Sequence, residues 1–84
     1  MSSITVYTTN ACPFCVRAKA LLDARGLPYE EINLGRDAED RAKLAQKTGM
    51  MTFPQILIDE QLVGGFDELS AADKSGRLKE LVSA

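Results

Sequence analysis

The stretch Thr9-Asn10-Ala11-Cys12-Pro13-Phe14-Cys15 decides the fold, and it contains both cysteines of the chain. The β-branched and aromatic run Ile4–Thr8 before it predicts a strand. The run Val16–Arg25 after it predicts a helix, with Gly26 as its left-handed cap. Two cysteines separated by two residues, between a strand and a helix, are typical of a redox motif that closes into a small disulfide and reopens.

Pro13 places the first cysteine at the start of the helix. Proline is favoured at the first helical position, because its missing N–H would have no intrahelical partner there. Cys12 is then expected at the N-cap, where free N–H groups and the positive helix end favour a thiolate over a thiol. We therefore expect Cys12 to be the nucleophile. Cys15, about one turn later, is expected to be the resolving thiol.

A structural zinc half-site and a pair of inert core cysteines are the alternatives. Structural zinc takes four ligands, usually Cys and His. The chain has 2 cysteines and no histidine, so one monomer cannot complete such a site. A proline between two cysteines at this spacing argues against an inert pair. We expect redox chemistry and no metal.

Length and charge limit the class of protein. The 84 residues suit a single small domain over 1–84, and a net charge of −2 offers no basic surface for nucleic acid or membrane. No apolar run approaches the roughly 18 residues of a membrane span. Met1-Ser2-Ser3 leads straight into a strand, without the features of a signal peptide. We expect a cytoplasmic protein, where a disulfide is usually catalytic or transient.

The rest of the chain predicts the order β-α-β-α-β-β-α. Further strands are expected at 29–33, 55–58 and 62–63, and a last helical region follows Gly65 and breaks near Gly76. A strand–helix–strand unit should be right-handed with parallel strands, and a hairpin added to it gives a four-stranded mixed sheet. This is an α/β fold with helices on both faces of the sheet. The dithiol then lies at the carboxyl end of a central strand, where open α/β sheets place their sites.

The middle helix is expected to follow an N-cap at Asp37 and to run through Thr48, with Gly49 ending it. The side chains predicted to face inward are Ala38, Ala42, Leu44 and Ala45. Those predicted to form a solvated charged face are Arg36, Glu39, Asp40, Arg41, Lys43 and Lys47.

Thr52-Phe53-Pro54 precedes the apolar strand. A proline there either begins the strand or forms a cis peptide in a tight turn, and the dithiol favours the second interpretation. A cis bond would leave the backbone of Phe53 free to pair with an extended peptide-like ligand beside Cys12.

Gly64-Gly65-Phe66-Asp67 leads into the last helical region. Glycines allow a ligand to approach the backbone, and a helix N-terminus binds a carboxylate. Asp67 could pair with an ammonium group, so an α-amino-acid head group would fit. Taken alone, the segment is more simply interpreted as a hairpin exit followed by a helix cap.

Together, Cys12-Pro13-Phe14-Cys15, Thr52-Phe53-Pro54 and Gly64-Gly65-Phe66-Asp67 resemble the glutaredoxin family in order and spacing. The chain resembles its bacterial dithiol members over essentially the whole length. The resemblance implies a thioredoxin fold, a cis Pro54, and glutathione as electron donor without a tightly bound cofactor.

The resemblance also implies a glutathione site. Phe53 would pair with the cysteinyl backbone, and the Phe66 and Asp67 amides would bind the γ-glutamyl carboxylate. The Asp67 side chain would face the γ-glutamyl ammonium. The expected glutathione-binding residues are Thr9, Phe14, Thr52, Phe53, Pro54, Gly65, Phe66 and Asp67, with Pro13 and Phe14 surrounding the thiolate.

Two departures from the family concern basic residues. Many relatives have a lysine three residues before the first cysteine, where this chain has Thr9. Many also have a basic residue just before the Thr-x-Pro segment, where Met50 and Met51 stand. In those relatives, both basic groups would hold the glycine carboxylate of glutathione. Because this chain lacks both, we expect the glycine end of glutathione to be loosely held. Lys47 is one candidate replacement.

Phe14 stands where many relatives have tyrosine, and all 3 phenylalanines of the chain lie in the site motifs. Ordinary packing against the core explains them as well as the alternative does. That alternative is an apolar rim around Cys12 on which protein or peptide disulfides dock.

The implied function is glutathione-dependent reduction of protein disulfides and deglutathionylation of proteins, by a monomer in electron transport and cell redox homeostasis. Ribonucleotide reductase is one candidate acceptor. One alternative function is an electron donor to ribonucleotide reductase that is itself reduced by thioredoxin reductase. Asp67 argues against this alternative, because it suits the amino group of glutathione. A carrier of an iron–sulfur cluster, bridging two monomers through Cys12 and glutathione, is another alternative. Pro13 argues against the carrier, since cluster-carrying relatives usually have glycine there.

Overall fold

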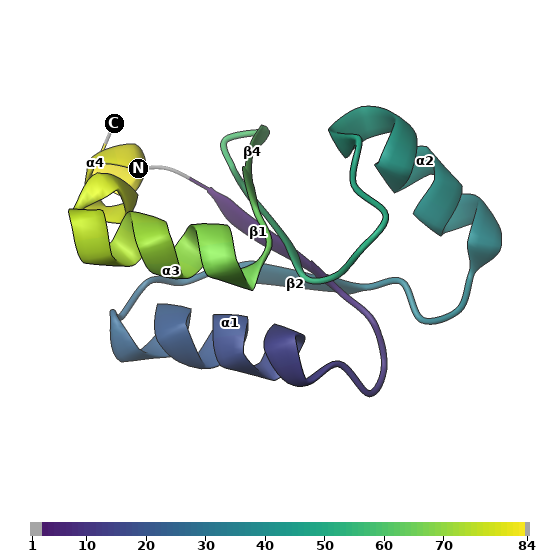
Figure 1. The fold of residues 1–84 in the computed structure, drawn as a ribbon, viewed down its shortest axis with the longest axis horizontal. Helices are drawn as coiled ribbons and strands as arrows, with labels where there is room; N and C mark the ends of the chain where they lie inside the picture. The colour runs from purple at the N-terminus through teal and green to yellow at the C-terminus, as the bar shows by residue number, and fades with distance from the viewer. Residues whose placement is uncertain (1–2, 84) are drawn as a thin grey trace.

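Residues 3–83, which the computed structural model describes, form four β-strands and four α-helices (Figure 1). In chain order these are β1 Ile4–Thr8, α1 Pro13–Ala24, β2 Glu30–Asn33, α2 Ala38–Thr48, β3 Gln55–Ile58, β4 Gln61–Gly64, α3 Phe66–Ser75 and α4 Arg77–Ser83. The predicted order is confirmed, and Gly76 divides the last helical region into α3 and α4. Met1 and Ser2, which entered the expectation about a signal peptide, lie outside the described residues.

The strands form a mixed sheet in the order β2-β1-β3-β4. β1 pairs with β2 in parallel and with β3 in antiparallel orientation, and β4 returns antiparallel to β3. The central position predicted for the first strand is confirmed. The loop after β1 therefore carries the dithiol across the carboxyl end of the sheet.

Helices cover both faces of the sheet, as predicted. Figure 1 shows α1 and α3 side by side, and α2 standing apart from them. The core on the α1 side comprises Ile4, Val6, Ala18, Leu22, Ile56, Ile58, Leu69, Ala72 and Leu78. Successive residues of a strand point to opposite faces, so Leu57 lies on the other face and Thr8 lies on the α1 side with Val6. All four residues of β3 are buried, as expected of a strand covered on both faces.

The caps of α2 are confirmed, but its apolar face is smaller than predicted. The Asp37 side chain accepts a hydrogen bond from the Asp40 amide at 3.0 Å. Of the four residues predicted to face inward, Leu44 is buried and Ala45 partly so, whereas Ala38 and Ala42 are exposed. The prediction was wrong for these two alanines, because α2 stands apart from the other helices and packs mainly through Leu44.

None of the helices in residues 3–83 is long and apolar enough to cross a membrane.

Truncating Leu22 should measure the contribution of the core between α1 and the sheet. Leu22 is 0% exposed, so Leu22→Ala should lower the free energy of unfolding by about 2–5 kcal/mol in urea titrations. Leu62→Ala is the matched control, since Leu62 is 38% exposed on β4. It should cost about 1 kcal/mol or less. Equal losses in the two variants would contradict this description of the core.

Candidate active site

Cys12 is the N-cap of α1, as the sequence predicts. Its backbone is extended, with φ −114° and ψ 99°, and Pro13 begins the helix. The Cys15 amide donates a hydrogen bond to Cys12 Sγ at 3.2 Å. The Cys15 and Val16 amides also point at the Cys12 carbonyl oxygen, at 3.1 and 3.2 Å. The first turn of α1 therefore directs N–H dipoles at the sulfur and at the backbone of the same residue, an arrangement that favours negative charge on the sulfur.

The Thr52-Phe53-Pro54 segment reaches the same sulfur from the other side. Cys12 Sγ lies 3.7 Å from the carbonyl oxygen of Phe53, to which its thiol can donate. The Phe53–Pro54 peptide bond is cis, as the resemblance implied. Two segments about forty residues apart in the chain thus meet at Cys12.

Cys15 lies behind Cys12 and is 2% exposed. Both thiols are free. Burial is the main cause that raises the pKa of the Cys15 thiol to about 11, and a hydrogen bond with the Cys12 side chain adds to it. A hydrogen bond with the Thr9 backbone and the charge of Lys19 act in the opposite direction. At neutral pH Cys15 is therefore a protonated thiol in the resting protein.

A cleft of about 180 Å³ lies beside Cys12. We call it the proline cleft, and it is lined by Phe14, Met50, Thr52, Phe53, Pro54, Gly65, Phe66, Asp67 and Glu68. Every residue predicted to bind glutathione lines this cleft except Thr9. Three motifs far apart in the sequence therefore form one concave surface beside Cys12.

Aromatic rings form one wall of the proline cleft. The Phe14 and Phe66 ring centroids are 6.1 Å apart with an interplanar angle of 36°. Phe14 is 49% exposed, so it does not simply pack into the core. The Arg17 guanidinium lies over its ring at 5.2 Å. Both phenylalanines thus line the cleft, and Phe14 also presents an apolar surface to solvent beside Cys12.

Of the two glycines before α3, Gly64 is required by the backbone geometry next to the cleft. Gly64 has φ +131°, and a Cβ there would lie 2.7 Å from the Glu68 side chain. The Gly65 amide donates to the Glu68 carboxylate at 2.8 Å. Phe66 and Asp67 are the first two residues of α3, so their amides have no intrahelical acceptor. These two amides are available to an anion in the cleft.

Arg41 was predicted on the solvated face of α2, and this was wrong. Its Nε donates to the Gly35 carbonyl oxygen at 3.0 Å, and its Nη2 donates to that oxygen and to the Thr9 hydroxyl. The guanidinium also lies over the Phe53 ring, 5.2 Å from the centroid. The side chain reaches Gly35 because Arg41 lies near the start of α2, which begins at Ala38 shortly after Gly35.

Thr9 and Lys47 are therefore placed differently from the cleft residues. The Thr9 hydroxyl donates to the Gly35 carbonyl oxygen at 2.9 Å and accepts from Arg41. Lys47, the candidate replacement for a missing basic residue, pairs with Glu60 in the turn after β3. The cation brought to the Thr9 side of the site is Arg41.

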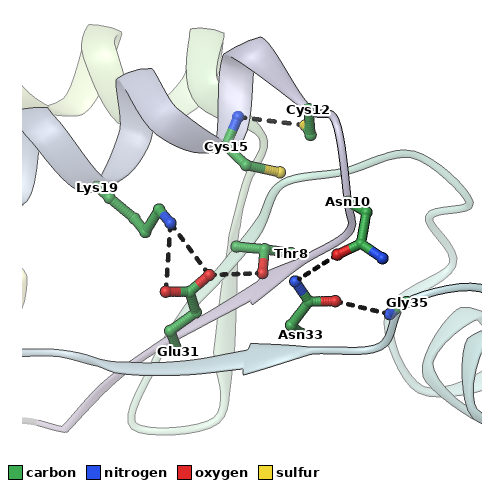
Figure 2. Close-up of polar contacts among 8 residues, drawn as sticks. All are labelled: Thr8, Asn10, Cys12, Cys15, Lys19, Glu31, Asn33 and Gly35. Carbon is green, nitrogen blue, oxygen red and sulfur yellow. Dashed lines mark hydrogen bonds and ion pairs between the residues drawn. The ribbon is translucent and has the colours of Figure 1, made fainter.

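A second cavity, of about 550 Å³, lies on the opposite side of the dithiol. We call it the Lys19 cavity; Thr8, Cys12, Cys15, Lys19, Glu31 and Asn33 are among its lining residues. Figure 2 shows two sets of hydrogen-bonded residues at this site, one joining Thr8, Glu31 and Lys19, and one joining Asn10 and Asn33 of the cavity lining to the Gly35 amide. Neither of these two hydrogen-bonded sets of residues was predicted from the sequence. The one feature of the sequence that could have indicated this site is the position of Lys19. It follows Cys15 by four residues and therefore lies on the same face of the helix.

The part of the chain that the structure describes holds no group of three or more His, Cys, Asp or Glu side chains close enough together to bind a metal ion.

A cysteine pair with one partly exposed and one buried side chain, at the N-terminus of a helix and facing a cis-proline loop, defines a thiol–disulfide oxidoreductase of the thioredoxin fold. The comparisons with known proteins narrow this class. The family model for glutaredoxin matches residues 4–63. The chain belongs to the glutaredoxin family, whose members are glutathione-dependent thiol oxidoreductases.

Individual relatives agree with this assignment. The chain is 46% identical over 84 residues to a glutaredoxin of Pseudomonas aeruginosa, covering 100% of both chains. It is 40% identical over 82 residues to glutaredoxin 3 of Escherichia coli K12, covering 98% of this chain and 99% of the relative.

Solved structures show the same fold. The solution structure of a Brucella melitensis glutaredoxin has a TM-score of 0.82 and 42% identity, covering 94% of this chain and 86% of that one. A buckwheat glutaredoxin, solved as a glutathione complex, has a TM-score of 0.88 and 28% identity. That comparison covers 98% of this chain and 77% of the buckwheat chain.

Alkylation should distinguish the two thiols by their environments. Iodoacetamide at neutral pH should modify Cys12 and leave Cys15 intact, because the reagent reacts with thiolates and Cys15 is both buried and protonated. Adduct formation on Cys15 should increase only as the pH approaches about 11. Mass spectrometry of digested protein gives the modified sites. In urea-unfolded protein both cysteines should react alike; equal rates in the folded protein would contradict the assigned environments.

Proposed function

We propose that this protein reduces protein disulfides and protein–glutathione mixed disulfides through Cys12 and Cys15, with glutathione as the electron donor. The observation that carries the proposal is the position of Cys12 Sγ. The sulfur accepts a hydrogen bond from the Cys15 amide at 3.2 Å and lies 3.7 Å from the Phe53 carbonyl oxygen, next to the proline cleft. The buckwheat relative solved with glutathione supports a glutathione site here.

Deglutathionylation needs Cys12 alone. The Cys12 thiolate attacks the glutathione sulfur of a protein–glutathione disulfide, and the protein thiolate leaves with the electron pair of the broken bond and takes up a proton. Glutathione is now bound to Cys12 as a mixed disulfide. A second glutathione thiolate attacks that bond, so that glutathione disulfide leaves and the Cys12 thiolate returns. The N–H group of Cys15 stabilises the charge on the departing Cys12 sulfur.

Reduction of a protein disulfide needs both cysteines. The Cys12 thiolate attacks one substrate sulfur, and the other leaves as a thiolate. Cys15 then loses its proton and attacks Cys12 Sγ, which releases the second substrate thiolate and forms the Cys12–Cys15 disulfide. Two molecules of glutathione restore the dithiol and leave as glutathione disulfide. Glutaredoxins have reduction potentials of roughly −200 to −230 mV, close enough to the potential of the glutathione couple for this exchange to proceed.

Glutathione is proposed to lie extended in the proline cleft. Its cysteinyl backbone would pair with Phe53, and Thr52, Pro54 and Gly65 would line its path. The free amides at the start of α3, those of Phe66 and Asp67, would bind the γ-glutamyl carboxylate. The Asp67 carboxylate would face the adjacent ammonium group. Supporting this arrangement, all of these residues line the same cleft beside Cys12.

Arg41 is proposed to replace the lysine that this chain lacks at Thr9. Its guanidinium donates to the Thr9 hydroxyl, so a positive charge lies beside the position where the family's lysine begins. The residue also contacts the ring of Phe53, which lines the proline cleft. A carboxylate at the glycine end of glutathione would meet this cation. The expected loose hold on that end is therefore partly offset by Arg41, and not by Lys47.

The proposed setting is the cytoplasm, where the protein would act as a monomer in electron transport and redox homeostasis. Phe14, exposed beside Cys12, would contact protein substrates on the solvent side of the cleft. Ribonucleotide reductase is one candidate acceptor of its electrons.

Single-cysteine variants should separate the two reactions. Cys12→Ser should abolish turnover of both a glutathionylated peptide and a peptide disulfide, because no nucleophile remains. Cys15→Ser should keep deglutathionylation and lose disulfide reduction. Both are measured with glutathione, glutathione reductase and NADPH consumption. Activity retained in Cys12→Ser would exclude this mechanism.

Removing the Arg41 charge should weaken glutathione binding. Arg41→Met should raise the KM for glutathione about three- to tenfold at low salt, because one charge-assisted contact at a partly exposed site is lost. The effect should shrink as salt is added. Lys43→Met is the matched control, since Lys43 makes an exposed ion pair with Glu39 elsewhere on α2. An unchanged KM in Arg41→Met would remove Arg41 from the site.

A further inference from the structure

The Lys19 cavity contains a charged group that the mechanism above does not use. The cavity is lined by both cysteines and by Lys19 and Glu31, and it lies on the opposite side of the dithiol from the proline cleft. Two sides of the same dithiol therefore have different chemistry. The proline cleft is lined by aromatic rings, backbone amides and the carboxylates of Asp67 and Glu68, whereas the Lys19 cavity has an ammonium paired with a carboxylate.

The fold brings three elements together at this ion pair. Lys19 follows Cys15 by four residues, so both side chains leave the same face of α1. Glu31 on β2 is the register partner of Val6 on β1, so its side chain lies on the α1 side of the sheet. Thr8, two residues after Val6, lies on that side too. Figure 2 shows Cys15 and Lys19 pointing from α1 towards the strands that carry Thr8 and Glu31.

Hydrogen bonds hold the pair in place. Glu31 Oε2 accepts from the buried Thr8 hydroxyl at 2.8 Å and from Lys19 Nζ at 3.1 Å. Glu31 Oε1 lies 3.3 Å from the same Nζ. A long lysine side chain, which would otherwise move freely in solvent, is thereby held over the cavity next to Cys15.

Both members of the pair are charged at neutral pH. Hydrogen bonds from Thr8 and then Lys19 lower the pKa of Glu31, and the hydrogen bond to Glu31 raises the pKa of Lys19. A carboxylate with a lowered pKa is a poor proton acceptor, so Glu31 does not suit the role of base. Lys19 is the member whose charge acts on Cys15, and it lowers the pKa of that thiol.

The other titratable groups around Cys15 do not replace Lys19. Cys12 on the same helix raises the pKa of Cys15, and this effect of its charge ends once Cys12 is bonded to a substrate sulfur. Burial remains as the obstacle to ionisation. On the strand side, Glu31 faces Lys19, and Tyr29 interacts with this pair and with Asp23. Lys19 is thus the cation that opposes burial when Cys15 has to react.

We propose that Lys19, held by Glu31 and Thr8, is a positioning residue that favours the thiolate of Cys15 in the resolving step. It would thereby set the rate of dithiol reduction independently of deglutathionylation. The inference rests on the proposed function, because only that mechanism gives Cys15 a step of its own.

The step balances without an external oxidant or reductant. The Cys15 thiol releases a proton to water in the cavity, and its thiolate attacks Cys12 Sγ of the mixed disulfide. The Cys12–Cys15 bond forms as the bond from Cys12 to the substrate sulfur breaks. The substrate leaves as a thiolate with that electron pair and is protonated by water. Lys19 stays protonated throughout and acts by its charge.

The size of the effect is limited by a known compensation. A neighbouring cation increases the thiolate fraction, but a thiolate of lower pKa is a weaker nucleophile, with a Brønsted coefficient of about 0.4–0.5. A tenfold gain in thiolate therefore gives a net gain of about threefold in rate. The contribution of Lys19 should be of this order, and it should depend on pH.

Glutathione disulfide is a probe that separates the two steps. Its reaction with the reduced protein first gives the Cys12–glutathione mixed disulfide and one glutathione. Attack by Cys15 then gives the Cys12–Cys15 disulfide and a second glutathione. Acid quenching at successive times, followed by mass spectrometry, gives one rate for formation and one for resolution. The comparison uses wild type, Lys19→Met, Lys19→Arg and Lys43→Met, the last losing the same charge on α2.

At neutral pH, Lys19→Met should slow resolution about threefold and leave formation within about twofold of wild type. Its resolution rate should approach that of wild type as the pH rises towards the Cys15 pKa. Lys19→Arg should retain most of the rate, and Lys43→Met should match wild type. Unchanged resolution in Lys19→Met, or an equal fall in both steps, would overturn the inference. A wild-type protein that forms no mixed disulfide would instead refute the proposed function.

Discussion

The hydrogen bond from the Cys15 amide to the Cys12 sulfur connects the chemistry of this protein to its fold. It exists because α1 begins at Pro13, directly after Cys12. The helix in turn is held against the sheet by Ala18 and Leu22, which are fully buried. The position of one sulfur thus depends on the packing of α1 on the sheet, and the Phe53 loop only has to approach a sulfur already in place.

Much of the fold could be predicted because its signals are local. Pro13 at the start of α1, Asp37 before α2 and the left-handed glycines at 49 and 76 each act within one helical turn. The continuous apolar residues of β3 indicate a strand that is covered on both faces, and the alternating residues of β1 indicate one that is more deeply buried on one face. The three site motifs meet because the fold brings the ends of β1, the loop before β3 and the start of α3 to one place, which the family resemblance implied.

The parts that could not be predicted are contacts between segments with no local signal. Arg41 looks like its charged neighbours on α2, and only the fold of the loop at Gly35 shows that it turns inward. Glu31 lies on a short edge strand whose residues are mostly exposed, so its register against β1 is not specified by an apolar pattern. The two exposed alanines of α2 show a different limit. An apolar stripe in the sequence indicates which face of a helix is apolar, but not how closely that face packs against the rest of the protein.

The burial of Cys15 directly behind Cys12 has a consequence for damage by small oxidants. A peroxide in solution would meet Cys12, the more accessible of the two cysteines, first and would oxidise it to a sulfenic acid. Cys15 can then condense with that group, so that water leaves and the ordinary disulfide remains. Irreversible sulfinic and sulfonic acids require further oxidation of the same sulfur. A protected neighbouring thiol therefore makes peroxide injury at this site repairable by the normal reductant.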